Sequence, residues 1–167
     1  MDSELAANLQ HLHPDAFGWA VHCCGGDAGR AEDVLQNAYL KLAAEKARFD
    51  GRSAFKTWWF GVIRLTAHEE LRRARFRESL VGRLLTSFTE ETQPPPTRHL
   101  ELEEQARELR SALAQLPARQ AEVLHLSFYQ DLSLSEAAQV MRISLGSART
   151  HYERGKARLR ELLPRHE

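Results

Sequence analysis

Cysteine is scarce in this sequence of 167 residues, and the two cysteines that occur, Cys23 and Cys24, are adjacent. Adjacent cysteines have poor geometry for a structural disulfide and lack the paired spacing of a zinc site. His11, His13 and His22 lie nearby in the sequence, so a metal or redox centre is an alternative to buried thiols and solvated imidazoles. Because no Asp or Glu accompanies them at a recurrent ligand spacing, we predict no metal site and no cofactor.

Long apolar runs are also missing, and none approaches the length of a membrane span. The segment Met1–Gln10 lacks the basic stretch and apolar core of a signal peptide, so we expect a cytoplasmic protein without membrane insertion. There is no phosphate-binding glycine loop and no nucleophile motif. The sequence therefore predicts no catalytic residue and argues against an enzyme.

An excess of one charge is absent overall, since 23 basic residues balance 23 acidic ones, but the charges are segregated. Leu71–Arg83 carries five arginines against one glutamate, and Arg142–Arg165 carries seven basic against two acidic residues. Between them, Glu90–Glu108 carries six glutamates against two arginines. This pattern predicts two separate anion-binding surfaces.

Strand signals are missing throughout, and helical periodicity predicts an all-α fold. The expected helices cover residues 5–24 with an interruption at Pro14, 31–46, 54–77, 100–116, 118–129, and two more from about 134 and 145. Periodicity is lost over 84–99, where three consecutive prolines favour an extended spacer. We therefore predict two small helical bundles, 1–83 and 100–167, joined by a flexible proline-containing linker at 84–99.

The stretch Leu132–Leu159 has the pattern of a helix-turn-helix. Ser133 and Glu136 form a capping box that starts one helix, and Ser144 can cap a second helix after a short turn. Such a second helix lays its first residues along base edges in the major groove, while later basic residues neutralise phosphates. Our alternative for this segment is a basic, solvated helix that closes a small bundle.

The second of these helices is expected to pack inward through Ala148 and Gly155 and to present a cationic face rich in hydrogen-bond donors. The predicted base-edge candidates are Arg149, His151 and Glu153, the predicted phosphate candidates are Arg154, Lys156 and Arg158, and Ser147 and Thr150 lie on the same face.

Aromatic residues lead into the arginine cluster of the first bundle, an arrangement typical of proteins that bind unpaired or forked DNA. We interpret Trp58 and Phe60 as core residues and leave Trp59 open between core and DNA contact.

Two sets of motifs resemble the extracytoplasmic-function (ECF) group of bacterial RNA polymerase sigma factors in its minimal two-domain form. Ala114–Val123 is similar to the family's A-x-L-P-x-R-x-R-E-V, and Ile143–Arg149 is similar to I-S-x-G-T-V-K. In the first bundle, Ala31–Gln36 and Phe49–Trp58 carry the resemblance. Both domains match in the right order around a linker, which makes the pair much more specific than a helix-turn-helix alone.

The resemblance implies that the first domain binds core RNA polymerase and opens the minus-ten element, that the second domain reads the minus-thirty-five element as duplex, and that an anti-sigma protein is a candidate regulator. Residues implied to face polymerase are Glu32, Asp33, Gln36, Tyr39 and Leu40. Residues implied to hold a flipped minus-ten base or to lie near the melted strands are Gly51, Arg52, Ser53, Phe55, Trp59, Arg64, Arg72 and Arg73.

Several positions depart from the family pattern. Arg30 and Asn37 stand where acidic residues are common, which predicts weaker attraction to a basic polymerase surface unless other contacts, a regulator or phosphorylation compensate. Leu65 replaces a usual asparagine, so we expect a different minus-ten preference. Arg142 replaces the usual turn glycine and would cost about 1 kcal/mol if its backbone is left-handed.

The recognition helix also departs from the pattern at His151 and Glu153, and the minus-thirty-five sequence is therefore not predicted. The main alternative function is a free-standing helix-turn-helix regulator whose first bundle dimerises or senses a ligand. Such a regulator would bind a palindromic operator by itself, whereas most sigma factors bind promoters poorly without core enzyme.

Overall fold

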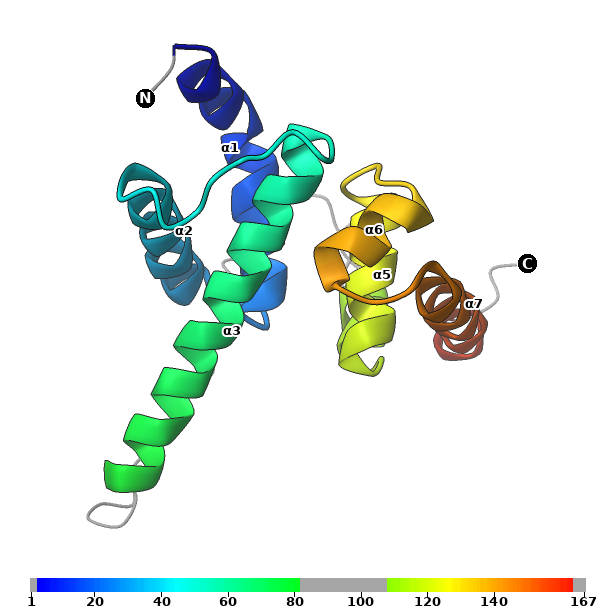
Figure 1. The fold of residues 1–167 in the computed structure, drawn as a ribbon. Coiled ribbons are helices and arrows are strands. Elements are labelled where there is room, and N and C mark those ends of the chain that lie inside the picture. Colours follow the sequence, from blue (N-terminus) through cyan, green and yellow to red (C-terminus); the bar gives the residue numbers. More distant parts are fainter. Residues whose placement is uncertain (1–2, 82–107, 164–167) are drawn as a thin grey trace, which may run out of the picture. The chain divides into compact units, whose positions relative to one another are not determined.

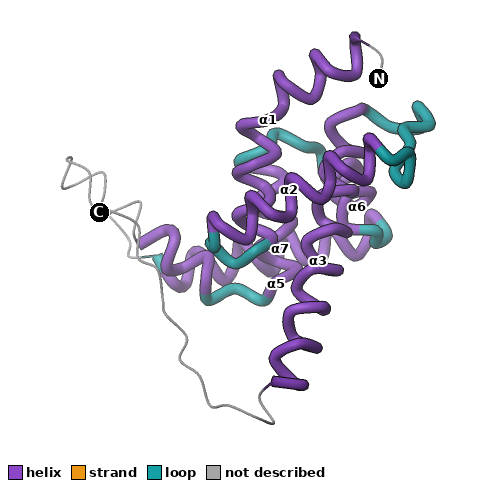
Figure 2. Tube along the Cα trace, turned by 90° about the vertical axis from the view of Figure 1, so that its left-hand side faces the viewer, coloured by secondary structure: helices purple, strands orange, loops and turns teal. Residues whose placement is uncertain are grey.

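The computed structural model describes residues 3–81 and 108–163 of the chain. Every regular element in these two ranges is an α-helix (Figure 2), which confirms the predicted all-α fold. The chain divides into two compact units. The predicted linker at 84–99 lies outside the described residues, so the domain limits stay a prediction. No helix in the described ranges is both long enough and apolar enough to span a bilayer.

The first unit contains the helices α1 (Ser3–Cys23), α2 (Ala28–Ala43) and α3 (Phe55–Val81) (Figure 1). The second unit contains α5 (Ala118–Phe128), α7 (Leu145–Leu162) and most of α6 (Leu134–Met141), and residues 108–114 are also helical.

Helix α1 passes through Pro14 without a break, so the predicted interruption there is wrong. A proline inside a helix removes one backbone hydrogen bond and leaves the carbonyl four residues earlier without its donor. Pro14 and Gln10 are both exposed, so water can hydrate that carbonyl. After the proline, Ala16, Trp19 and Ala20 are buried, and this packing against α2 and α3 holds the rest of α1 in place.

Helix α2 starts three residues earlier than the periodicity predicted, because Asp27 caps it. The Asp27 carboxylate accepts a hydrogen bond from the backbone N–H of Arg30 at 3.0 Å, which satisfies one of the free donors of the first turn. From this start, α2 buries Ala31, Val34, Leu35 and Ala38.

The core of the first unit lies where α1, α2 and α3 pack against one another. Trp19, Trp59, Phe60 and Ile63 are fully buried there. The indole N–H of Trp19 donates to the backbone carbonyl of Phe60 at 3.0 Å and ties α1 to α3. The last turns of α3 extend beyond α1 and α2 (Figures 1 and 2), and their side chains are mostly exposed.

The core of the second unit forms between α5 and α7. Val123, Leu124 and Leu126 of α5 and Ala148 of α7 are buried in it. Gly155 of α7 permits a close helix approach, because a Cβ atom at this position would lie 2.9 Å from Leu124 Cδ1. This packing fixes which face of α7 remains exposed to solvent.

Candidate functional site

The helix-turn-helix forms as predicted, with both caps in place. Ser133 and Glu136 make the reciprocal capping box: the Ser133 backbone N–H donates to Glu136 Oε2 at 2.9 Å, and the Glu136 N–H donates to Ser133 Oγ at 3.3 Å. Ser144 caps α7, because its Oγ accepts from the backbone N–H of Ser147 at 3.1 Å. The two caps fix where α6 and α7 begin.

The turn between α6 and α7 bends at Arg142, which has a left-handed backbone with φ of 54°. The N–H of Arg142 donates to the carbonyl of Gln139, and the next N–H, from Ile143, donates back to the carbonyl of Ala138 at 3.0 Å. This closes α6 in the manner in which glycine usually ends a helix. The left-handed conformation that the sequence suggested at this position is therefore present.

We expect Arg142→Gly to stabilise the protein by about 1 kcal/mol, since glycine adopts a left-handed backbone without the steric cost that an arginine carries. Arg142 is exposed and loses no packing in the exchange. Urea denaturation followed by circular dichroism measures the change. An unchanged or lower unfolding free energy would mean that the arginine side chain stabilises the turn by contacts of its own.

Helix α7 buries Ala148 and Gly155 and leaves its opposite face in solvent, as predicted. Tyr152 and Leu159 are half-buried along the edges of the packed face. The exposed residues of the predicted DNA-contacting set are Ser147, Arg149, Thr150, Glu153, Arg154 and Arg158, and the half-buried ones are His151 and Lys156.

Internal contacts separate the residues of this face into two groups. The Thr150 hydroxyl donates to the carbonyl of Gly146 at 3.0 Å. The Lys156 ammonium pairs with Glu153 at 3.0 Å and lies 4.4 Å from the centroid of the Tyr152 ring. Within the described residues, the exposed side chains of Arg149, Arg154 and Arg158 make no ion pair. Of the predicted DNA-contacting residues, these three arginines can therefore bind an anion without breaking an ion pair within the protein.

The loop before α3 combines a glycine turn with a cluster of aromatic rings. Gly51 has φ of 73°, a value that favours glycine. Phe49 meets Phe55 edge-on with ring centroids 5.3 Å apart, and Trp58 lies 5.3 Å from Phe49 and 5.4 Å from Phe55. Phe49 is 40% exposed, so this loop presents aromatic surface.

Phe49, which belongs to this cluster, is not among the predicted site residues. Its spacing of six residues from Phe55 across a glycine turn was the available signal. Of the predicted loop residues, Ser53 and Phe55 are half-buried, and Arg52 is exposed and pairs with Asp50 at 3.3 Å.

The prediction that Trp59 contacts DNA conflicts with the structure. Trp59 has no exposed surface, and its ring lies 5.1 Å from that of Tyr39, whereas its neighbour Trp58 is half-buried and belongs to the aromatic cluster of the loop. Successive residues of a helix are rotated by about 100°, so only one of these two adjacent indoles, that of Trp58, reaches the surface.

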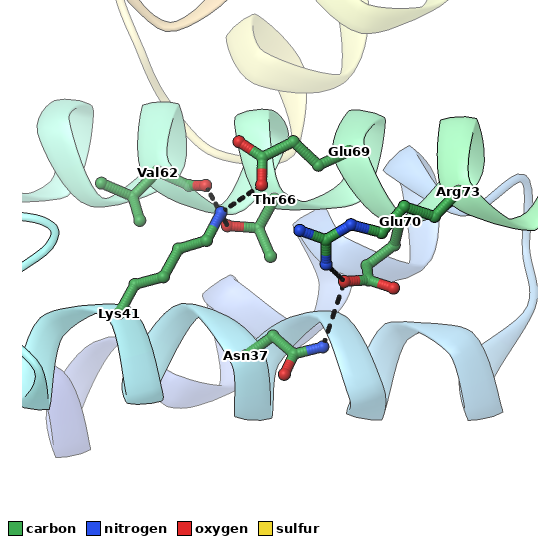
Figure 3. A network of polar contacts seen from close by, with 7 residues as sticks. All are labelled: Asn37, Lys41, Val62, Thr66, Glu69, Glu70 and Arg73. Atoms are coloured by element: carbon green, nitrogen blue, oxygen red, sulfur yellow. Dashed lines mark hydrogen bonds and ion pairs between the residues drawn. The ribbon is translucent and has the colours of Figure 1, made fainter.

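Two polar networks connect α2 to α3 (Figure 3). In one, the Lys41 ammonium donates to Glu69 at 2.7 Å and to the hydroxyl of Thr66 at 3.1 Å, and that hydroxyl donates to the carbonyl of Val62. In the other, Glu70 accepts from the Asn37 amide at 3.4 Å and from the Arg73 guanidinium at 2.9 Å. The networks attach the middle of α3, at Thr66, Glu69 and Glu70, to α2.

The predicted DNA-contacting arginines of α3 differ in their surroundings. Arg72 is exposed, Arg73 is exposed but paired with Glu70, and Arg64 is half-buried and already engaged in contacts within the protein.

The residues expected to face polymerase gather along one groove beside α2. Glu32, Asp33 and Gln36 are exposed, Leu40 is 58% exposed, and Tyr39 is half-buried. All five line a groove of about 880 Å³, together with Leu9, His13 and Phe17 of α1. The Tyr39 hydroxyl lies 2.9 Å from His13 Nδ1, and burial raises the pKa of this phenol. The groove thus combines apolar walls with two carboxylates near one end of α2.

Arg30 and Asn37 do not belong to this groove. Asn37 is half-buried and binds Glu70 of α3, and Arg30 pairs with the capping Asp27 at 3.2 Å. The weaker polymerase contact expected from these two residues, which rested on departures from the family pattern, stays a prediction. Asn37 instead belongs to the α2–α3 interface, where a second carboxylate would repel Glu70.

The histidines and cysteines near the end of α1 have separate surroundings. His13 contacts Tyr39, and His22 stacks on Trp19 with ring centroids 5.4 Å apart. Cys24 is buried, and burial, reinforced by Asp27 and opposed by Arg30, raises the pKa of its thiol. Among the described residues no group of three or more His, Cys, Asp or Glu side chains is arranged to hold a metal ion.

Comparison with known proteins agrees with this arrangement. The family model described as Sigma-70 region 2 matches residues 9–77, and that of Sigma-70, region 4 matches residues 106–159. The ECF RNA polymerase sigma factor SigX of Bacillus subtilis is 31% identical over 141 residues, covering 81% of this chain and 71% of SigX. EcfG of Rhodopseudomonas palustris is also 31% identical, over 138 residues that cover 83% of this chain and 74% of EcfG.

The fold is similar to that of the sigma factor RpoE from Bartonella quintana, solved in complex with the anti-sigma factor NepR. The TM-score is 0.73 at 23% identity, and the match covers 96% of this chain and 97% of RpoE. With both sigma-70 domains present in order and relatives identical at nearly a third of positions, the chain belongs to the ECF group of sigma-70 factors, the alternative sigma factors that direct transcription initiation.

Proposed function

We propose that this sigma factor divides its contacts among three surfaces. The groove beside α2 binds core RNA polymerase through Glu32, Asp33, Gln36, Tyr39 and Leu40. The loop at Gly51–Phe55 and the arginines of α3 hold the opened minus-ten element. Helix α7 reads the minus-thirty-five element as duplex through Arg149 and its neighbours. The role is non-enzymatic, since RNA synthesis is catalysed by the polymerase. The factor acts on DNA inside the cell.

The observation that carries the polymerase contact is Leu40. A leucine that is 58% exposed beside two exposed carboxylates, in a groove lined by Leu9 and Phe17, is typical of a protein interface, where an apolar centre is surrounded by charge. The carboxylates favour a basic partner surface.

An anti-sigma protein is the form of control that we propose. RpoE was solved with NepR, and CnrH, which has a TM-score of 0.63 to this chain at 20% identity, was solved with the cytosolic domain of CnrY.

The test uses purified protein and bacterial core polymerase that lacks its own sigma factor. We expect binding to core and new transcripts from promoters that core alone ignores. Leu40→Asp should weaken core binding at least about tenfold, because a buried interface leucine becomes a charge that must lose its water. The variant should fold, since Leu40 is exposed in the free protein.

Leu65→Asp is the matched control, an exposed leucine of the same unit that lies outside the groove. It should leave core binding unchanged. Failure of the wild-type protein to bind core, together with binding to a palindromic operator by the protein alone, would instead establish a free-standing regulator. Equal loss of binding in both variants would argue against the groove as the contact.

A further inference from the structure

Glu153 is the acidic member of the predicted DNA-contacting residues of α7. Its side chain is 68% exposed and lies on the same face as Arg149, one helical turn further along α7. Because DNA is a polyanion, a carboxylate on this face costs affinity by repelling the phosphates. In the major groove a carboxylate can offset that cost by accepting a hydrogen bond from a base, since two of the four bases present an amino donor there.

The contacts of Glu153 hold its carboxylate in place and leave one oxygen available. Glu153 Oε1 pairs with the Lys156 ammonium at 3.0 Å, and this ammonium lies 4.4 Å from the centroid of the Tyr152 ring. Tyr152 in turn stacks on Phe128 of α5, with ring centroids 5.9 Å apart. An ionised carboxylate accepts through both oxygens, and Glu153 Oε2 has no partner among the described residues. The ion pair therefore orients the carboxylate and leaves Oε2 free to accept from a base.

The spacing of Arg149 and Glu153 suits the reading of neighbouring base pairs. The second helix of a helix-turn-helix presents such side chains to base edges in the major groove. Four residues rise about 6 Å along a helix, and base pairs are stacked about 3.4 Å apart, so the two side chains reach base pairs no more than about two steps apart. Arg149, which is exposed and makes no ion pair in the described ranges, is suited to the two acceptors of guanine. Glu153 therefore meets a base close to that guanine.

The chemistry of the base edges decides which base suits a carboxylate. In the major groove cytosine presents the N4 amino donor, whereas guanine presents two acceptors and thymine presents an acceptor and a methyl group. Adenine also has an amino donor, but its neighbouring N7 acceptor repels the second carboxylate oxygen. We propose that Glu153 selects a cytosine in the minus-thirty-five element, within about two base pairs of the guanine bound by Arg149. The proposal rests on the proposed function, and the preference belongs to this chain because Glu153 departs from the family pattern.

The first test uses holoenzyme assembled from core polymerase and a promoter that the wild-type protein uses, with its minus-thirty-five element randomised. Sequencing of the DNA recovered in promoter complexes gives the base preference at each position. We expect wild type to prefer cytosine at one position by about fivefold to 150-fold. Glu153→Gln should change the preference at that position to adenine, since a glutamine amide accepts from N6 and donates to N7.

Glu161→Gln is the matched control. It removes the same charge from an exposed position about two turns further along α7, and it should leave every base preference unchanged.

The second test replaces the selected cytosine with N4-methylcytosine, which keeps its base pair but loses the amino hydrogen that faces the major groove. We expect wild-type holoenzyme to bind the modified promoter at least about fivefold more weakly. Holoenzyme with Glu153→Gln should bind the modified and unmodified cytosine promoters equally.

The proposal is overturned if Glu153→Gln leaves every preference unchanged, or if it changes a position at which wild type prefers a base other than cytosine. Glu153 would then act only as the ion-pair partner of Lys156. If Arg149→Ala alters a preference in that case, the proposed function stands and the cytosine contact alone is wrong. If wild-type holoenzyme does not initiate, the proposed function fails as well.

Discussion

A Trp59→Ala variant is expected to lose about 3–5 kcal/mol of unfolding free energy, the range for truncating a fully buried aromatic residue. Trp59 has no exposed surface, and its ring lies 5.1 Å from Tyr39 and 6.0 Å from Trp58. Truncation would leave a cavity where α2 meets α3, and the surrounding helices can fill it only in part. Urea denaturation followed by circular dichroism at 222 nm gives the difference without relying on tryptophan fluorescence.

Two companion variants separate packing from hydrogen bonding and from DNA contact. Trp59 Nε1 is buried and has no hydrogen-bond partner among the described residues, so Trp59→Phe removes an unsatisfied donor and keeps most of the volume. We expect it to cost far less than the alanine variant. Trp58→Ala, at a half-buried position, should destabilise less and should impair promoter opening more. The opposite order of stabilities would contradict the burial of Trp59.

Arg149→Ala is expected to weaken promoter-specific initiation by about 5- to 150-fold, the range for losing one bidentate base contact. Arg149 is exposed in the first turns of α7 and makes no ion pair within the described residues, so its removal costs the fold little. Core binding should stay intact, because the proposed polymerase groove belongs to the other unit. Transcript yield from a promoter with and without its minus-thirty-five element measures the effect.

Arg160→Ala provides the matched control for charge. Arg160 is also exposed on α7 but lies eleven residues further along, in the last turn. It should reduce initiation only slightly and equally on both promoters. A loss of core binding in Arg149→Ala, or an equal effect of both variants, would contradict base reading by Arg149.

The capping and turn patterns predicted the helix ends of the second unit well, because each helix end depends on residues close in sequence. Ser133 with Glu136, Ser144, and the strain at Arg142 all act within one helical turn, and the structure places each as expected. The resemblance to ECF sigma factors was likewise read from short motifs, each of ten or fewer consecutive residues, in both bundles.

Predictions failed where the answer depended on packing between helices. Neighbouring tryptophans both fit an apolar stripe, and only the positions of α1 and α2 decide that Trp59 is buried while Trp58 reaches the loop. Asn37 lies on the face of α2 toward Glu70 of α3, a partner 33 residues away. Pro14 does not break α1, because burial of the α1 residues that follow it outweighs the loss of one backbone hydrogen bond.

The pair between Glu70 and Arg73 has a consequence for how DNA affinity responds to ionic strength. Arg73 is already neutralised in the free protein, by a carboxylate only 25% exposed that the Asn37 amide also holds. To bind a phosphate, Arg73 must break its ion pair with Glu70. The Glu70 carboxylate then remains close to the DNA and repels the phosphates. Arg73 therefore adds less to the steepness with which salt weakens binding than the unpaired Arg72 does. An arginine of this kind contributes mainly to register on the DNA, and its neighbours supply the attraction.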